Sequence, residues 1–199
     1  MKKTLTAFMV AFTLLVTSGG MSFAQDIQRG QEAYDAGDYA AAAKWYRKSA
    51  EQGDAGARFN LGFMYENGQG VTQDYKQAVK WYRKSAEQGD AAAQHNLGVM
   101  YDEGQGVIQD YKQSVKWYRK AAEQGQVFAQ FNLGGMYGTG QGVIHDKVYA
   151  HMWWNIAAST GDTRATKNRD IVAKQMTSSQ IAEAQKLARE CVQKQFKGC

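Results

Sequence analysis

Few side chains of this sequence have the types and spacing that enzyme chemistry requires. The three histidines are His95, His145 and His151, and no cysteine or acidic cluster accompanies them to complete a zinc site. The sequence contains no His-Glu-x-x-His, no phosphate-binding loop and no Gly-x-Ser-x-Gly, the local signatures of metalloproteases, nucleotide hydrolases and serine hydrolases. We therefore predict a protein that is not an enzyme and that binds neither a metal ion nor another cofactor.

The two cysteines, Cys191 and Cys199, lie close together at the C-terminal end of the chain. They do not form a Cys-x-x-Cys motif and no histidine is nearby, which favours a structural pair over the alternative of two reactive thiols. In an oxidising compartment, two neighbouring cysteines form a lasting disulfide. We predict a bridge between Cys191 and Cys199 that closes a short loop at the end of the last helix.

The N-terminal residues are organised like a secretory signal peptide. Two lysines precede an apolar stretch from Leu5 to Val16, which is too short to span a membrane, and Ser22 and Ala24 supply the small residues of a cleavage site. Removing residues 1–24 leaves 175 of the 199 residues and lowers the net charge from +5 to +3. We expect a periplasmic or secreted protein with no membrane span in the mature chain. Its mild charge does not favour nucleic acid as a partner.

A period of 36 residues organises most of the remaining chain. Residues 75–110 and 111–146 are identical at 26 of 36 positions, and a Gly-Gln-Gly-Val segment recurs three times at the same interval. These glycine pairs follow no predicted strand, so they indicate turns between helices and not a nucleotide-binding loop. Four tryptophans mark the period: Trp45, Trp81, Trp117 and Trp153.

Each unit is predicted to fold as two helices. One helix follows a capping aspartate, such as Asp74, and ends before a glycine, such as Gly89. The other runs from about Ala91 to Tyr101 and stops at Gly104. Gly98 lies inside this second helix, where glycine costs about 1 kcal/mol relative to alanine, so we expect a neighbouring helix to pass close to it.

The pattern Ala-x-x-x-Leu-Gly-x-Met-Tyr-x-x-Gly-x-Gly-Val, followed by Asp, Trp-Tyr, Ala-Ala and Gly, resembles the Sel1-like repeat family, a relative of the tetratricopeptide repeats. The resemblance implies an all-α, right-handed α-solenoid of antiparallel helix pairs that binds proteins or peptides in a concave groove. The implied organisation is a signal peptide at 1–24, a tetratricopeptide-like helix pair at 25–54, three repeats within 55–162 (55–90, 91–126 and 127–162), and capping helices at 163–199.

Basic residues recur on the tryptophan-containing helices at i, i+3 and i+4 spacing, which places them on one side of each helix. They fit two interpretations. They bind an acidic polymer, or they pair with Glu51, Glu87 and Glu123, each four residues after an arginine; we favour the pairing. We call these nine residues the basic ladder: Lys44, Arg47, Lys48, Lys80, Arg83, Lys84, Lys116, Arg119 and Lys120.

The fourth tryptophan helix lacks this ladder. Met152, Asn155 and Ile156 occupy the matching positions, so a face that is polar in the other units becomes partly apolar and needs a cover. An amphipathic segment from about Ser178 to Phe196 is suited to that role. We therefore predict that the last helix caps the solenoid.

Differences between the repeats predict where a ligand binds. Positions that hold the solenoid together must be alike in every copy, whereas positions facing a ligand are free to vary. The varying positions lie on a separate helix face, which corresponds to the groove of tetratricopeptide proteins. The alternative is that they pack against the next unit or vary neutrally. We call these residues the predicted groove residues: Phe59, Phe63, Glu66, His95, Val99, Asp102, Glu103, Phe128 and Phe131.

The function that we predict is an exported, non-catalytic scaffold, expected to be a monomer, that holds a protein or peptide partner in this groove. Its aromatic side chains would anchor the partner and its charged ones would set specificity. One alternative is an envelope hydrolase like the cysteine-rich Sel1-like proteins described as β-lactam-binding hydrolases, although their cysteine pair in each repeat is missing here. Another is a structural protein that maintains envelope integrity.

Overall fold

The computed structural model describes the backbone of residues 18–199 and side chains from residue 25 onward. Most of the predicted signal peptide lies outside these residues, and its cleavage stays a prediction. The described part consists of ten α-helices without a strand. Their bounds are α1 Ser18–Asp35, α2 Tyr39–Glu51, α3 Ala55–Asn67, α4 Tyr75–Glu87, α5 Ala91–Glu103, α6 Tyr111–Ala122, α7 Val127–Thr139, α8 Lys147–Ala158, α9 Thr163–Ala173 and α10 Ser178–Gln193.

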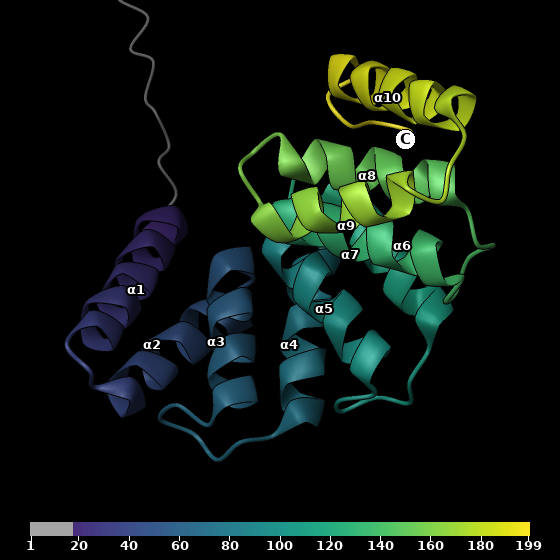
Figure 1. Cartoon of the computed structure of the whole chain (residues 1–199). Coiled ribbons are helices and arrows are strands. Elements are labelled where there is room, and N and C mark those ends of the chain that lie inside the picture. Colours follow the sequence, from purple (N-terminus) through teal and green to yellow (C-terminus); the bar gives the residue numbers. More distant parts are fainter. Residues whose placement is uncertain (1–17) are drawn as a thin grey trace, which may run out of the picture.

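Consecutive helices pack against each other from α1, in purple in Figure 1, to α9, and the last helix, α10 in yellow, packs on α8. Helices α1 and α2, α3 and α4, α5 and α6, and α7 and α8 form pairs, and each pair contacts the next through its second helix. Such nearest-neighbour packing defines a solenoid. The predicted all-α solenoid of helix pairs is thus the fold of this protein.

The predicted capping residues define the helix ends. The Asp74 carboxylate accepts hydrogen bonds from the backbone amides of Lys76 and Gln77, at 2.9 and 3.1 Å, at the start of α4. Helix α5 extends to Glu103 and ends at Gly104, as predicted, because Gly104 adopts the left-handed conformation that closes the helix, with φ of 72°.

A glycine inside the first helix of each pair, α1, α3, α5 and α7, makes room for an aromatic ring. A Cβ atom on Gly98 would lie 2.6 Å from Cδ1 of Tyr118, so the predicted close approach is confirmed. The same contact recurs in every unit, which places the glycines in structural register. The pairs are Gly30 with Tyr46, Gly62 with Tyr82, Gly98 with Tyr118 and Gly134 with Trp154.

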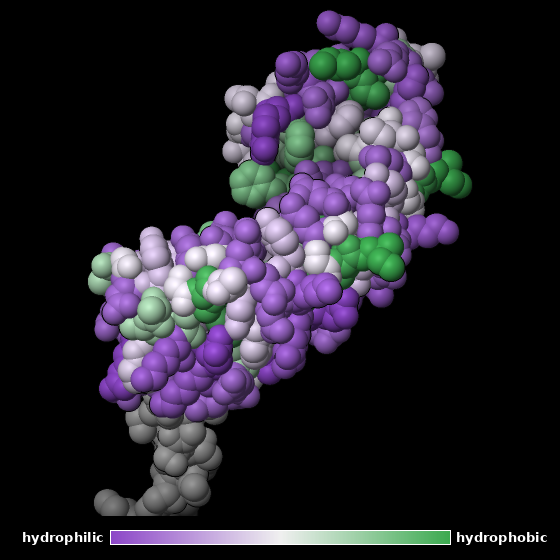
Figure 2. All heavy atoms as spheres, turned by 90° about the horizontal axis from the view of Figure 1, so that it is seen from below, coloured by the Kyte–Doolittle hydropathy of each residue, from purple (hydrophilic) through white to green (hydrophobic). Residues whose placement is uncertain are grey.

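The Gly-Gln-Gly-Val loops lie along one edge of the solenoid. Gly106 has a φ of 69°, and a Cβ atom there would overlap the carbonyl oxygen of Tyr75 at the start of the preceding α4. The loops also carry Ile108 and Ile144, which are 91% and 89% exposed. Figure 2 looks at the molecule from below, the side on which Figure 1 places the α3–α4 and α5–α6 loops, and shows hydrophobic side chains as separate green patches on a mostly polar surface.

Helix α10 lies on α8 and covers the side chains that replace the basic ladder. Met152 and Ile156 are only 1% and 2% exposed and pack with Ala188 and Cys191 of α10. The helix ends at Gln193 and not at the predicted Phe196, because the chain turns back there: the Phe196 amide donates to the Cys191 carbonyl at 2.8 Å. In the structure a disulfide joins Cys191 to the C-terminal Cys199, with Cα atoms 5.6 Å apart.

Removing this bridge should destabilise the C-terminal cap. We expect the double variant Cys191→Ser, Cys199→Ser to lose about 2 to 3 kcal/mol of unfolding free energy, because the bridge closes a short loop and restricts the unfolded chain. Urea denaturation with and without a reductant measures this. Reduction should destabilise the wild type and leave the variant unchanged. A wild type that is insensitive to reductant would contradict the prediction.

None of the described helices is long and apolar enough to cross a membrane. Among residues whose side chains are described, no group of three or more histidines, cysteines and acids lies close enough together to hold a metal ion.

Candidate functional site

The predicted groove residues come from α3, α5 and α7, on the side that receives the aromatic rings of α4, α6 and α8. Because Gly62 has no side chain, the ring of Tyr82 packs against α3 and its hydroxyl reaches Glu66. Tyr118 reaches Asp102 in the same way in the next repeat, at 3.3 Å. The helix glycines thus determine which polar groups meet on this face.

Polar groups in the middle of the face form a continuous chain of hydrogen bonds across three repeats. Tyr82 donates to Glu66, and the Asn96 amide donates to the Tyr82 hydroxyl at 3.0 Å. The other end of the Asn96 amide lies 3.0 Å from Nδ1 of His95, and the Asn132 amide lies 3.3 Å from Nε2 of His95. A carbonyl oxygen only accepts and an amide nitrogen only donates, so His95 donates from Nδ1 and accepts at Nε2.

Burial of this network shifts the pKa values of its members. Burial lowers the pKa of His95, which keeps the ring neutral at pH 7 and able to accept from Asn132. Burial also raises the pKa of Asp102, against the opposing effect of the hydrogen bond from Tyr118. The pKa of Tyr82 is raised by burial first and by the Glu66 charge second, so this hydroxyl stays a donor. Three predicted groove residues, Glu66, His95 and Asp102, thus already take part in hydrogen bonds within the protein.

Variation at one groove position follows from its packing partner. Glu66 and Asp102 each meet a tyrosine hydroxyl, whereas the equivalent residue of the third repeat is Gly138. Its neighbour is Trp154, and a Cβ atom on Gly138 would already lie 3.0 Å from the far edge of the indole ring. The larger ring requires the smaller residue, so this difference between repeats does not need a ligand to explain it.

The C-terminal part of the face is covered by an arginine from α9. The Arg164 guanidinium lies 5.3 Å from the ring centre of Phe128 and 4.7 Å from that of Phe131. Asp162 holds it there through a 2.7 Å ion pair. Phe128 is still 53% exposed, Val99 packs on the core, and Glu103 is exposed. At the C-terminal end of the face, Arg164 thus covers part of the aromatic surface of Phe128 and Phe131.

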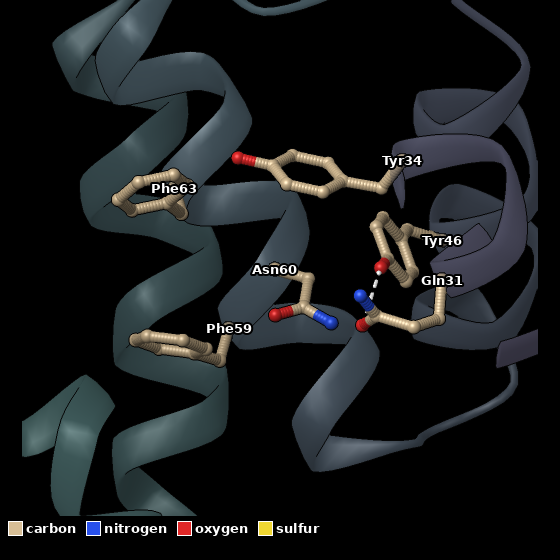
Figure 3. A pocket seen from close by; sticks show the side chains of 6 residues that line it. All are labelled: Gln31, Tyr34, Tyr46, Phe59, Asn60 and Phe63. Carbon is tan, nitrogen blue, oxygen red and sulfur yellow. Dashed lines mark hydrogen bonds between the residues drawn. The ribbon is translucent and has the colours of Figure 1, made fainter. Parts of the chain in front are cut away.

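An open pocket with a volume of about 200 Å³ lies at the N-terminal end of the face (Figure 3). Helix α3 contributes two predicted groove residues and an asparagine, while α1 and α2 contribute a glutamine and two tyrosines. It is here that the structure brings predicted groove residues to a cavity. The lining residues are Gln31, Tyr34, Tyr46, Phe59, Asn60 and Phe63.

The polar groups of this pocket differ in whether they are already paired. Tyr46 donates to Gln31 at 3.2 Å, and burial raises the pKa of Tyr46 to about 12. Tyr34 donates to Gln69 at 3.1 Å. Asn60 lies near the Tyr46 hydroxyl without a hydrogen bond of regular geometry, whereas the equivalent Asn96 donates to Tyr82. Even with the Tyr46 hydroxyl as one partner, the Asn60 amide keeps a second N–H donor and its carbonyl oxygen for a ligand.

Sequence comparison of the repeats did not identify four of these residues. The register between Gly30 and Gly62 aligns Gln31 with Phe63 and Tyr34 with Glu66, a signal that was present in the sequence. Asn60 has asparagine counterparts at Asn96 and Asn132, so a comparison of varying positions does not select it. A residue that binds the main chain of a ligand has no reason to vary.

A family model described as the Sel1 repeat matches residues 27–54, 55–90, 91–126 and 127–162. The protein belongs to the Sel1 repeat family. Its first repeat is the unit that provides α1 and α2 and lacks the Gly-Gln-Gly-Val segment. The pocket therefore lies between the first two Sel1 repeats.

Solved structures of other Sel1 repeat proteins share this architecture. A Sel1 repeat protein from Oxalobacter formigenes is 36% identical with a TM-score of 0.67, and the match covers 89% of this chain and 67% of that one. The protein c5321, a protective antigen present in uropathogenic Escherichia coli strains displaying an SLR fold, is 34% identical with a TM-score of 0.53. That match covers 89% of this chain and 47% of c5321. No curated protein matched the sequence.

Proposed function

We propose that this Sel1 repeat protein is an exported, non-catalytic scaffold that binds an extended peptide segment of a partner protein. Sel1 repeats are typical of protein-interaction modules, and the family assignment supports a scaffold of this kind. The observation that carries the proposal is the pocket between α1, α2 and α3, which combines aromatic walls with an asparagine amide that has more donors and acceptors than its one neighbour, Tyr46, can use.

The chemistry of the pocket suits a peptide. Phe59 and Phe63 offer apolar surface for one side chain of the partner, and Phe63 is exposed. An asparagine amide carries both donors and an acceptor, so Asn60 can pair with a peptide group of an extended chain. Aromatic anchors beside main-chain contacts are a common basis of peptide recognition.

Export is supported by the sequence at both ends of the chain. The first 24 residues have the composition of a signal peptide, and the cysteine pair suits an oxidising compartment. We propose a periplasmic or secreted location on these grounds.

Peptide binding is tested with a random phage-displayed library selected on the wild-type protein. The double variant Asn60→Ala, Phe63→Ser should bind the selected peptides about tenfold or more weakly, because it removes the amide and one aromatic wall together. The matched control is Ile108→Ser, Ile144→Ser, which removes two exposed apolar side chains on the loop edge and should leave affinity unchanged. Fluorescence anisotropy gives the affinities, and circular dichroism shows that both variants fold.

Two results would refute the pocket assignment. In one, the selected peptides bind the pocket variant and the wild type equally well. In the other, the loop-edge control loses as much affinity as the pocket variant, which would move the binding surface to the loops.

A further inference from the structure

The basic ladder is largely uncompensated by acidic side chains. Within the described residues, the only ladder residue with a carboxylate oxygen within 4.0 Å is Lys48, which pairs with Asp26 at 2.9 Å. The pairing expected between the ladder arginines and Glu51, Glu87 and Glu123 does not occur. Eight positive charges on α2, α4 and α6, the second helices of three successive pairs, therefore have no ionic partner.

In each repeat the ladder arginine binds a tyrosine hydroxyl and not the expected glutamate. Arg47 donates to the Tyr65 hydroxyl at 2.6 Å, and the same bond recurs between Arg83 and Tyr101 and between Arg119 and Tyr137. A hydroxyl partner orients the guanidinium and leaves its charge intact, and four of its five N–H donors stay unengaged by this bond. Each guanidinium is thus positioned but not neutralised.

The ladder lysines lie against tryptophan rings. The ammonium groups of Lys84 and Lys120 are 4.7 and 4.8 Å from the ring centres of Trp81 and Trp117. Lys80 and Lys116 approach the same rings at 5.8 and 5.7 Å. These contacts hold flexible side chains close to the surface and reduce the entropy that a bound polymer would have to remove.

We propose that the basic ladder binds a linear anionic polysaccharide that runs across α2, α4 and α6. A single exposed lysine contributes little to binding, whereas several uncompensated charges in register attract a polymer whose charges also repeat. Each repeat adds one rung of two ammonium groups and a guanidinium. The rungs stop at α8, where Met152 and Ile156 take the lysine positions and α10 covers them.

Polysaccharide fits the ladder better than nucleic acid. Single-stranded nucleic acid is bound by aromatic rings on which bases stack, whereas Trp81 and Trp117 are buried and carry lysine ammonium groups above their rings. Carboxylate or sulfate groups on a sugar chain need only cations at the surface. The proposed export would also bring the protein to anionic glycans rather than to nucleic acid. This surface is separate from the pocket between α1, α2 and α3, so each proposal can fail without the other.

The test uses fluorescein-labelled oligogalacturonate and the full-length mature protein. A ladder variant and a control variant each remove four exposed lysines and lower the net charge by four. We expect the ladder variant to bind about tenfold or more weakly at 100 mM NaCl, with a shallower dependence of affinity on salt, and the control variant to stay within about twofold of the wild type. The ladder variant is Lys80→Gln, Lys84→Gln, Lys116→Gln, Lys120→Gln, and the control is Lys167→Gln, Lys174→Gln, Lys194→Gln, Lys197→Gln.

Tryptophan fluorescence provides a second measurement, because anionic polymer bound to the ammonium groups that lie over Trp81 and Trp117 should change the emission of these rings. Equal losses in the two variants would show that net charge alone attracts the polymer and would overturn the proposal. So would an absence of binding to the wild type at 50 mM NaCl. Tighter, ladder-dependent binding of single- or double-stranded DNA would overturn the choice of polysaccharide. The pocket variant should bind oligogalacturonate like the wild type.

Discussion

Replacing Gly106 by alanine is expected to lower the free energy of unfolding by about 3 to 5 kcal/mol, which combines a strained backbone with a steric overlap. Gly106 has a φ of 69°, where a side chain is disfavoured, and its Cβ atom would overlap the Tyr75 carbonyl. The backbone fixes the position of a Cβ atom, and the carbonyl is itself part of the backbone, so no side-chain rotation relieves the contact. Urea denaturation followed by circular dichroism at 222 nm measures the loss.

Gly89→Ala separates the two contributions. Gly89 has a φ of 101°, yet nothing lies within 4 Å of the position that its Cβ would occupy. We expect a loss of about 1 to 2 kcal/mol from backbone strain alone. Equal losses in the two variants would mean that the loop does not rest on the start of α4 as the structure shows.

Introducing lysines on α8, at the positions that match the basic ladder, should detach α10 from α8. In the double variant Met152→Lys, Ile156→Lys, two ammonium groups would lie beneath α10 among Ala188 and Cys191. Burying charges without partners should cost about 3 to 5 kcal/mol, unless α10 detaches to solvate them. Hydrogen exchange of the α10 amides, together with urea denaturation, measures both responses.

The reverse exchange on α6 is the matched control. Lys116→Met, Lys120→Ile places the same two apolar side chains on a helix that no cap covers, and we expect its unfolding free energy to change by less than about 1 kcal/mol. If both exchanges destabilise the protein equally, α10 is not a specific cover for α8. Unchanged α10 exchange rates in the α8 variant would lead to the same conclusion.

The solenoid was predictable because its determinants are local and repeated. Asp74 caps a helix next to it, Gly104 ends the helix that precedes it, and both signals recur every 36 residues. Gly98 predicted a close approach because an interior glycine is unfavourable unless a neighbour requires it. Met152 and Ile156 predicted that something must cover α8, since apolar residues there break an otherwise basic pattern.

The candidate binding face was harder to predict, because residues on it vary together with the residues that they contact. Gly138 differs from Glu66 and Asp102 because its partner is Trp154 and not tyrosine, and such a relation appears only when the helices are packed. Variation therefore identified positions that contact a different neighbour as readily as positions that contact a ligand. His95 is one such residue, since it connects Asn96 to Asn132.

The basic ladder shows a similar limit of helical spacing. A glutamate four residues after an arginine is within reach but does not have to bind it. Here the tyrosine hydroxyls of the next helix draw the guanidinium groups away, and Tyr65 lies 18 residues from Arg47 in sequence. Contacts of this range between helices decide which charges stay unpaired.

The cap on α8 also determines how proteins of this design can evolve. The features that receive α10 are confined to the last repeat, and the contact between an interior glycine and an aromatic ring lies within each helix pair, so a duplicated unit carries its own copy. A duplicated unit such as residues 91–126 can thus enter the middle of the array without altering either end. Each insertion would lengthen the face formed by α3, α5 and α7 and the basic ladder by the same step, so gene duplication alone could adjust the length of both.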